Sequence, residues 1–186
     1  MKPEQVNKID LTEKYALIGR FVVNFENIVQ EIRFTLSAIF QIQGLKTWDI
    51  SKVVFSQKQF TADPLISCLE SICYQILKDD ADSKELLKSI SEFKKRFIKQ
   101  VEMRNDLLHS TFYLGESENI VSSDIIPENE FYVTKHTAKK EGAVLKIVAE
   151  TTDDIKKHLD DLDALYEEIF KLKFRIFKTV QKLSEK

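Results

Sequence analysis

The stretch TTDDIKKHLDDLDALYEEIFKLKFRIFKTVQKLSEK, residues 151–186, has the strongest hydrophobic period in the chain. Its apolar residues recur every three or four positions, which places them on one face of an α-helix: Ile155, Leu159, Leu162, Tyr166, Ile169, Ile176, Val180 and Leu183. A second apolar edge, formed by Leu165, Leu172 and Phe177, makes this face wider than a coiled-coil seam. The stretch therefore predicts a long helix in a bundle, with apolar surface left over for a helix from another chain.

Two polar features of the same stretch refine this prediction. Lys173 is the one polar residue within the apolar stripe. Acidic residues gather in the N-terminal half and Lys and Arg in the C-terminal half, a distribution that suits the helix dipole. Thr151 or Thr152, followed by Asp153 and Asp154, is expected to begin the helix.

An equally long stripe predicts a first helix near the N-terminus. Its apolar residues are again spaced by three and four: Leu11, Tyr15, Ile18, Val22, Phe25, Val29, Ile32, Leu36 and Ile39. Asp10 or Thr12 is expected to cap its start, and Gly44 to mark its end.

Two further helices are expected in the middle of the chain. Asp63-Pro64 opens the first of them, with proline in the first turn, and its apolar face is Leu65, Leu69, Ile72 and Ile76. The second runs over about 83–109, with a buried side formed by Leu86, Ile90, Phe93, Phe97, Val101 and Leu108.

Residues 111–150 have a different character. Short runs rich in β-branched and aromatic residues are separated by Gly, Pro and Asn, which predicts a small antiparallel hairpin or meander. The expected fold is therefore mainly α: one domain over residues 1–186, an up-and-down bundle of about four long helices, with a small antiparallel β insertion at about 111–150, between the last two.

Composition narrows the function classes. The net charge of −2 gives no general attraction to nucleic acid or membrane, so any such binding needs a local patch. Cys68 and Cys73 have no metal-binding spacing and are expected to be reduced thiols, as in the cytoplasm. The polar N-terminus is unlike a signal peptide, and no run is apolar enough to span a bilayer. We expect a cytoplasmic protein without a metal, a cofactor or a membrane partner.

One segment could carry chemistry: Arg104-Asn105-Asp106-Leu107-Leu108-His109, at the predicted end of a helix. A guanidinium holds a phosphate through two parallel hydrogen bonds, and an imidazole exchanges a proton near neutral pH. Together Arg104 and His109 meet the needs of metal-free RNA cleavage, with Asn105 and Asp106 in support. The alternative is structural, because Arg and His are common at helix ends, where Asn or His often caps the carbonyls.

This segment resembles the Arg-x4-His motif of the HEPN superfamily (higher eukaryotes and prokaryotes nucleotide-binding). The expected layout is also similar: a long first helix containing Gly19-Arg20-Phe21-Val22-Val23-Asn24-Phe25-Glu26, a motif helix, a strand beginning Phe112-Tyr113-Leu114 and a long final helix. The resemblance implies a helical bundle that dimerises and brings two motifs together in one cleft. Many members are metal-independent RNases of toxin–antitoxin or defence systems.

The leading hypothesis is accordingly a homodimeric, metal-independent endoribonuclease that acts on RNA and pairs with an antitoxin or another protein. The alternatives are a non-catalytic HEPN-like binding or scaffolding module and a plain helical dimerisation domain. Lys94, Lys95, Arg96 and Lys99 precede the motif and could guide RNA, although such a run is more often a solvated helix face. Tyr113 could stack a base. His136 and His158 are expected on the surface.

Overall fold

The computed structural model of the chain describes residues 8–45, 55, 57, 60–108, 111–114, 131–139, 142–149 and 152–185. In the strands, and at residues 8–11, 14 and 152, only the backbone is described. The chain divides into two compact units. The first unit comprises Met1–Val23 and Glu102–Asp161, and the second comprises Asn24–Val101 and Leu162–Lys186.

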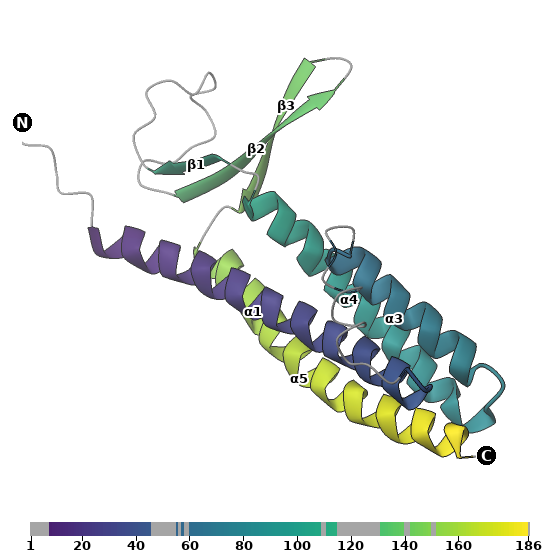
Figure 1. Cartoon of the computed structure of the whole chain (residues 1–186). Helices are drawn as coiled ribbons and strands as arrows, with labels where there is room; N and C mark the ends of the chain where they lie inside the picture. The colour runs from purple at the N-terminus through teal and green to yellow at the C-terminus, as the bar shows by residue number, and fades with distance from the viewer. Residues whose placement is uncertain are drawn as a thin grey trace, which may run out of the picture. The chain divides into compact units, whose positions relative to one another are not determined.

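Four α-helices account for most of the described residues (Figure 1): α1 (Lys8–Ile42), α3 (Ala62–Leu77), α4 (Lys84–Leu108) and α5 (Thr152–Ser184). A short 3-10 helix, Ala81–Ser83, precedes α4. The predicted mainly helical bundle is confirmed. No helix among the described residues is both long enough and apolar enough to cross a membrane.

The C-terminus of α1 is closed by a glycine, as expected. Gly44 has a φ of 98°, a left-handed conformation that favours glycine. Its N–H donates to the carbonyl of Gln41, and the N–H of Leu45 donates to that of Phe40. These are the two bonds of a Schellman motif, which satisfies the last helical carbonyls. The predicted cap at Asp10 or Thr12 is wrong, because both residues lie within α1.

The core of the second unit forms where the apolar faces of all four helices meet. Phe97 lies at its centre, stacked on Phe25 and Phe93 at centroid distances of 5.3 and 5.9 Å. All three rings are fully or almost fully buried. Other buried members come from each helix: Ile28, Ile32, Leu36, Ile39, Leu65, Leu69, Leu77, Leu86, Ile90, Leu165, Ile169, Leu172, Ile176 and Val180.

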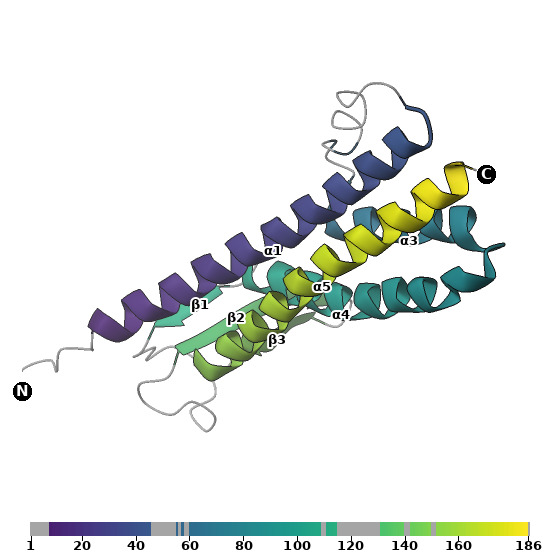
Figure 2. The same ribbon diagram turned by 90° about the horizontal axis from the view of Figure 1, so that it is seen from below.

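Polar contacts within the second unit fix the directions of α1 and α5. Asn24 Nδ2 donates to Asp163 Oδ1 at 2.7 Å, and Lys173 Nζ lies 2.6 Å from Glu31 Oε2. Residue numbers rise together along the two helices, so α1 and α5 run parallel there, as Figures 1 and 2 also show.

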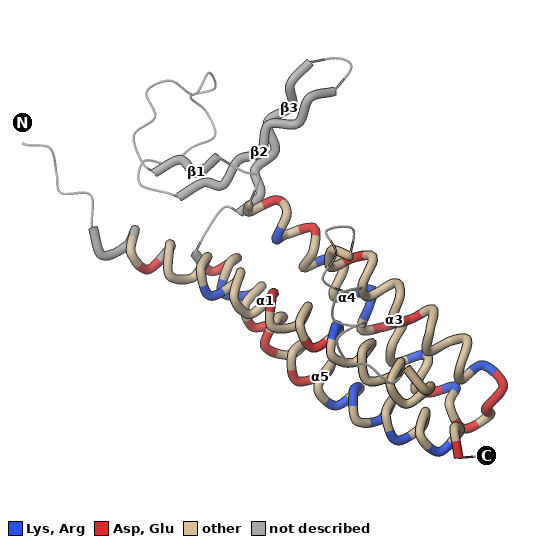
Figure 3. The backbone as a smooth tube through the Cα atoms, in the orientation of Figure 1, with Lys and Arg blue, Asp and Glu red and all other residues tan. Residues whose placement is uncertain are grey.

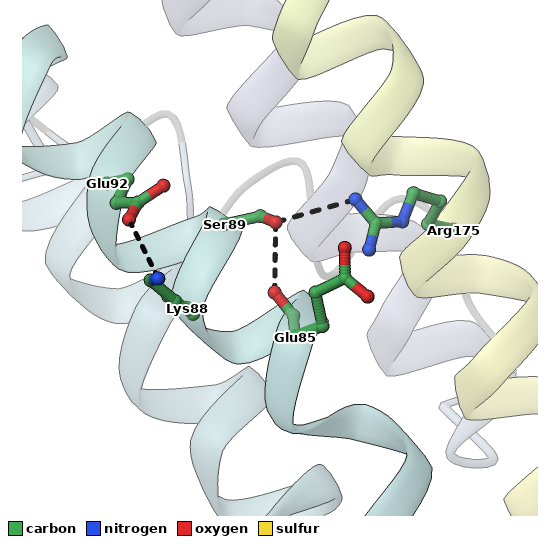
Figure 4. Close-up of polar contacts among 5 residues, drawn as sticks. All are labelled: Glu85, Lys88, Ser89, Glu92 and Arg175. Atoms are coloured by element: carbon green, nitrogen blue, oxygen red, sulfur yellow. Dashed lines mark hydrogen bonds and ion pairs between the residues drawn. The ribbon is translucent and has the colours of Figure 1, made fainter.

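The contacts between α4 and α5 have the opposite order. Arg96 pairs with Glu168, Arg175 Nη1 donates to Ser89 Oγ at 3.5 Å, and Lys182 Nζ lies 3.9 Å from Asp82. Figure 4 shows the middle contact, where Ser89 also donates to the Glu85 carbonyl of its own helix. The two helices therefore run antiparallel.

These directions correct the predicted up-and-down order. In an up-and-down bundle of four helices, the first and last are antiparallel, whereas here they are parallel. The short turn between α3 and α4 reverses the chain, so α3 points the same way as α1.

In the first unit the structure describes both helical segments and strands. Phe21, Met103, Leu107, Ile155 and Leu159 are buried there. The strands β1 (Thr111–Leu114), β2 (Phe131–Lys139) and β3 (Gly142–Ala149) are ordered β1-β2-β3, and both pairs are antiparallel. The register places Tyr113 opposite Tyr132, and an irregularity occurs between Val133 and Thr134.

Some residues of the predicted stripes are exposed. Tyr15, Tyr166 and Leu108 were expected in the core, but each has a large accessible surface. Because a straight helix has 3.6 residues per turn, a stripe read at steps of three and four drifts around its axis. Neighbouring positions are buried in the structure, among them Phe21, Ile28, Met103 and Leu107.

The two thiols give a test of the second unit. Burial, with a smaller contribution from Cys68, raises the pKa of Cys73 to about 12 from its ordinary 9.0. Because the thiolate is the reactive form, iodoacetamide at about pH 8 should modify Cys73 at least roughly 100-fold more slowly in the folded than in the urea-unfolded protein. Peptide mass spectrometry after a timed pulse measures this. Equal rates in the two states would contradict the buried position.

The same shift sets a pH dependence. In the unfolded chain the thiol loses its proton near pH 9, whereas in the folded chain it keeps the proton up to about pH 12. The contribution of this thiol to stability is therefore present below pH 9 and is lost as the pH rises through this window.

Candidate functional site

The five described residues of the motif, Arg104 to Leu108, lie in the last two turns of α4, within the first unit. Arg104, Asn105 and Asp106 are all half-buried. Arg104 Nη1 donates to Asn105 Oδ1 at 3.3 Å, so the amide holds one arm of the guanidinium. Arg104 and Asn105, two of the residues predicted to act together, are therefore in direct contact.

Two apolar neighbours fix the orientation of this segment. Met103 and Leu107, four residues apart on one face of α4, are both buried. Arg104, Asn105 and Asp106 project at other angles around the helix and are only half-buried. Partial shielding of the Arg104 guanidinium from water strengthens its interaction with an anion.

The structure does not describe the side chains of two further predicted site residues, His109 and Tyr113. His109 lies outside the described residues. Tyr113 belongs to β1, where the backbone and its pairing with Tyr132 are described, but not the side chain. The structure thus locates Arg104, Asn105 and Asp106, and the roles predicted for His109 and Tyr113 stay predictions.

The basic run that precedes the motif lies in the second unit. Lys94 Nζ is 2.8 Å from Glu70 Oε2, a hydrogen bond that lowers the pKa of Glu70. Arg96 pairs with Glu168 of α5. Lys95 and Lys99 are exposed. Ion pairing within the chain therefore takes up two of the four cations and leaves Lys95 and Lys99 as the exposed lysines of the run.

The second unit contains a pair of charged residues of which the sequence pattern singled out only one. Lys173, the polar residue in the stripe of α5, binds Glu31 of α1 at 2.6 Å, and their side chains are only 14% and 15% exposed. The ammonium also lies 4.4 Å from the Phe170 centroid and 5.5 Å from that of Phe174. The break in the stripe was the signal for Lys173, whereas nothing in the α1 pattern singled out Glu31.

His158, expected on the surface, is half-buried. Its ring lies edge-on to Phe21, with centroids 6.4 Å apart. Burial lowers the pKa of His158, and the nearby carboxylates of Asp161 and Asp154 oppose that shift. The imidazole is thus a packing partner in the first unit, where the neutral form is favoured. The side chain of His136, in β2, is outside the described part.

Among the described residues, no group of three or more His, Cys, Asp and Glu side chains could hold a metal ion. Comparison with protein-family models, with curated proteins and with solved structures finds no match to this chain.

Proposed function

We propose that this protein is a HEPN-like, metal-independent endoribonuclease of the cytoplasm. Its active site would be composite, with Arg104 and His109 of two subunits of a homodimer facing one RNA strand. Arg104 carries the proposal: it sits near the end of α4, half-buried, with one Nη held by Asn105. A toxin or phage-defence role, with an antitoxin or another protein as partner, belongs to the same proposal.

The proposed reaction is an internal displacement on RNA. His109 removes the proton from a 2′-hydroxyl, and the 2′-oxygen forms a bond to the adjacent phosphorus while the bond to the 5′-oxygen breaks. A protonated imidazole returns a proton to that leaving oxygen. Arg104 stabilises the additional negative charge on the phosphate oxygens through its planar fork. The products are a 2′,3′-cyclic phosphate end and a 5′-hydroxyl end.

We also propose that the antiparallel segment between α4 and α5 is a stable insertion with a part in binding. Tyr113 follows the motif by a few residues and offers an aromatic face on which an RNA base can stack. Lys95 and Lys99, which are exposed on α4, would contribute to the attraction of the phosphate backbone.

A non-catalytic HEPN-like module is the second candidate, and one observation favours it. Lys94 and Arg96 are engaged by Glu70 and Glu168, so the basic run that precedes the motif in the sequence offers less free positive charge than the sequence suggests. With a net charge of −2, the chain has little further attraction for RNA. Such a module would bind a protein or a nucleotide through Arg104 without cleaving RNA.

Substitution of Arg104 by lysine separates the two candidates. Lysine keeps the charge but lacks the fork that grips two phosphate oxygens, so RNA cleavage in EDTA should slow by about 10²–10³-fold. The matched control is Arg175→Lys, at an exposed arginine of α5, which should cleave at the wild-type rate. An Arg104→Lys protein that cleaves normally would exclude the proposed role of the guanidinium.

A further inference from the structure

The second unit has an unusually aromatic surface along α5. Tyr166, Phe170 and Phe174 follow one another at four-residue intervals and are 40%, 44% and 56% exposed. Residues at this spacing share one face of a helix. Phe170 and Phe174 touch edge to face, with centroids 5.0 Å apart. Large aromatic side chains are normally buried, so three in a row on an exposed stripe indicate an interaction surface.

This surface continues onto α1. Glu31 of α1 binds Lys173, whose ammonium lies against the Phe170 and Phe174 rings. Phe34, one turn beyond Glu31, is 39% exposed. We call Phe34, Tyr166, Phe170 and Phe174 the aromatic face. The Glu31–Lys173 ion pair at its edge is mostly shielded from water and joins α5 to α1 next to the Phe170 and Phe174 rings.

The size of the aromatic face suits a protein partner. At about 200 Å² for a whole aromatic side chain, the exposed fractions amount to roughly 350 Å². A standard interface covers about 800 Å² on each partner. The aromatic face alone would supply nearly half of that area, and the side chains that flank it on α5 would supply much of the remainder.

Acidic residues gather in the N-terminal half of α5 and basic residues in its C-terminal half (Figure 3). Asp163 and Glu167 precede the centre of the aromatic face, and Lys178 and Lys182 follow it. Asp163, Glu167, Phe170, Phe174 and Lys178 follow one another at steps of three and four, so they lie on a single stripe. Two copies placed antiparallel would bring each acidic end against the other copy's basic end. A parallel arrangement would oppose like charges.

We infer that the aromatic face is a two-fold interface with a second copy of this chain, in which the two α5 helices run antiparallel. The aromatic rings form its centre, and the acidic and basic ends of the stripe pair at its two edges. A two-fold interface uses the same patch on both subunits, and this patch is complementary to itself under that rotation. All residues of this interface belong to the second unit, and its formation does not depend on whether the protein cleaves RNA.

The test measures the oligomeric state of the full chain by sedimentation velocity from about 1 to 100 µM, a range that brackets common homodimer affinities. The wild type should be a dimer at tens of micromolar. Phe170→Glu/Phe174→Glu should weaken the dimer at least 100-fold, because the rings would be replaced by like charges facing one another. Tyr74→Glu is the matched control: Tyr74 is 55% exposed on α3, a helix that contributes no residue to the aromatic face, and its replacement should leave the dimer intact.

Circular dichroism verifies that each variant is folded. If the Phe170→Glu/Phe174→Glu protein is unfolded, Phe170→Gln/Phe174→Gln is used in its place. A monomeric wild type, or a dimer that survives these substitutions, would overturn the inference. The orientation has its own test: Lys178→Glu should weaken the dimer, and Glu167→Lys/Lys178→Glu should restore it at least 10-fold. Failure to restore it would rule out the antiparallel arrangement.

RNA cleavage by the same proteins is recorded separately. A dimer that depends on the aromatic face but has no RNase activity would contradict the proposed function and leave this interface standing. An active RNase whose dimer is unchanged by substitution of Phe170 and Phe174 would overturn this interface and leave the proposed function standing.

Discussion

Replacement of His109 by alanine is expected to reduce RNA cleavage by about 10²–10⁴-fold, the usual cost of removing a general acid or base. Alanine has no group that can take the proton from the 2′-hydroxyl or return one to the leaving oxygen. The proposal gives His109 a role in proton transfer and none in packing, so the free energy of unfolding should change by less than about 1 kcal/mol. Initial rates on a labelled RNA, together with thermal melts, measure both quantities.

His136→Ala is the matched control for this experiment, since it removes another histidine that the mechanism does not use. It should retain wild-type activity and stability. A structural role for His109 predicts a different pattern: an inactive wild type, and a clear loss of stability in His109→Ala through a lost helix cap. Cleavage that persists in His109→Ala would eliminate the proposed mechanism.

Phe97→Ala is expected to have the largest effect on stability, a loss of about 3–5 kcal/mol in the free energy of unfolding. The Phe97 ring is completely buried and stacks on both Phe25 and Phe93, so its removal leaves a cavity between α1 and α4 in the second unit. Such a loss is a large part of the stability of a typical domain. Urea unfolding followed by circular dichroism gives the value.

Tyr74→Ala is a suitable comparison, because it also removes an aromatic side chain from a helix of the second unit, but an exposed one. Its effect should stay within about 0.5 kcal/mol. If Phe97→Ala were no more destabilising than Tyr74→Ala, the three stacked rings could not be the centre of the core.

The sequence predicted the helices well because each has an apolar face that only a helix makes continuous. Gly44 marked the end of α1 correctly, since its positive φ is a local property that glycine alone adopts easily. The directions of the helices were not predictable in the same way. They depend on which faces meet, as in the Glu31–Lys173 and Ser89–Arg175 contacts between residues far apart in the chain.

The candidate site was predictable as a set of residue types but not as a geometry. Arg104 and Asn105 are adjacent in the sequence, and their side chains meet in the structure. The pairing of Lys94 with Glu70 and of Arg96 with Glu168 could not be anticipated, because each pair joins different helices. Tyr166 illustrates the same limit for packing: its place in the period is apolar, but the neighbouring helices do not cover it.

The chemistry of the RNA ends tests the central claim most directly. The purified chain is incubated with a single-stranded and a structured RNA in EDTA, and mass spectrometry identifies the new ends. We predict cleavage without metal that leaves 2′,3′-cyclic phosphate and 5′-hydroxyl ends, because the attacking oxygen is the neighbouring 2′-hydroxyl. Folded protein that leaves both RNAs intact, or cleavage that needs Mg²⁺ and leaves 5′-phosphate ends, would contradict it.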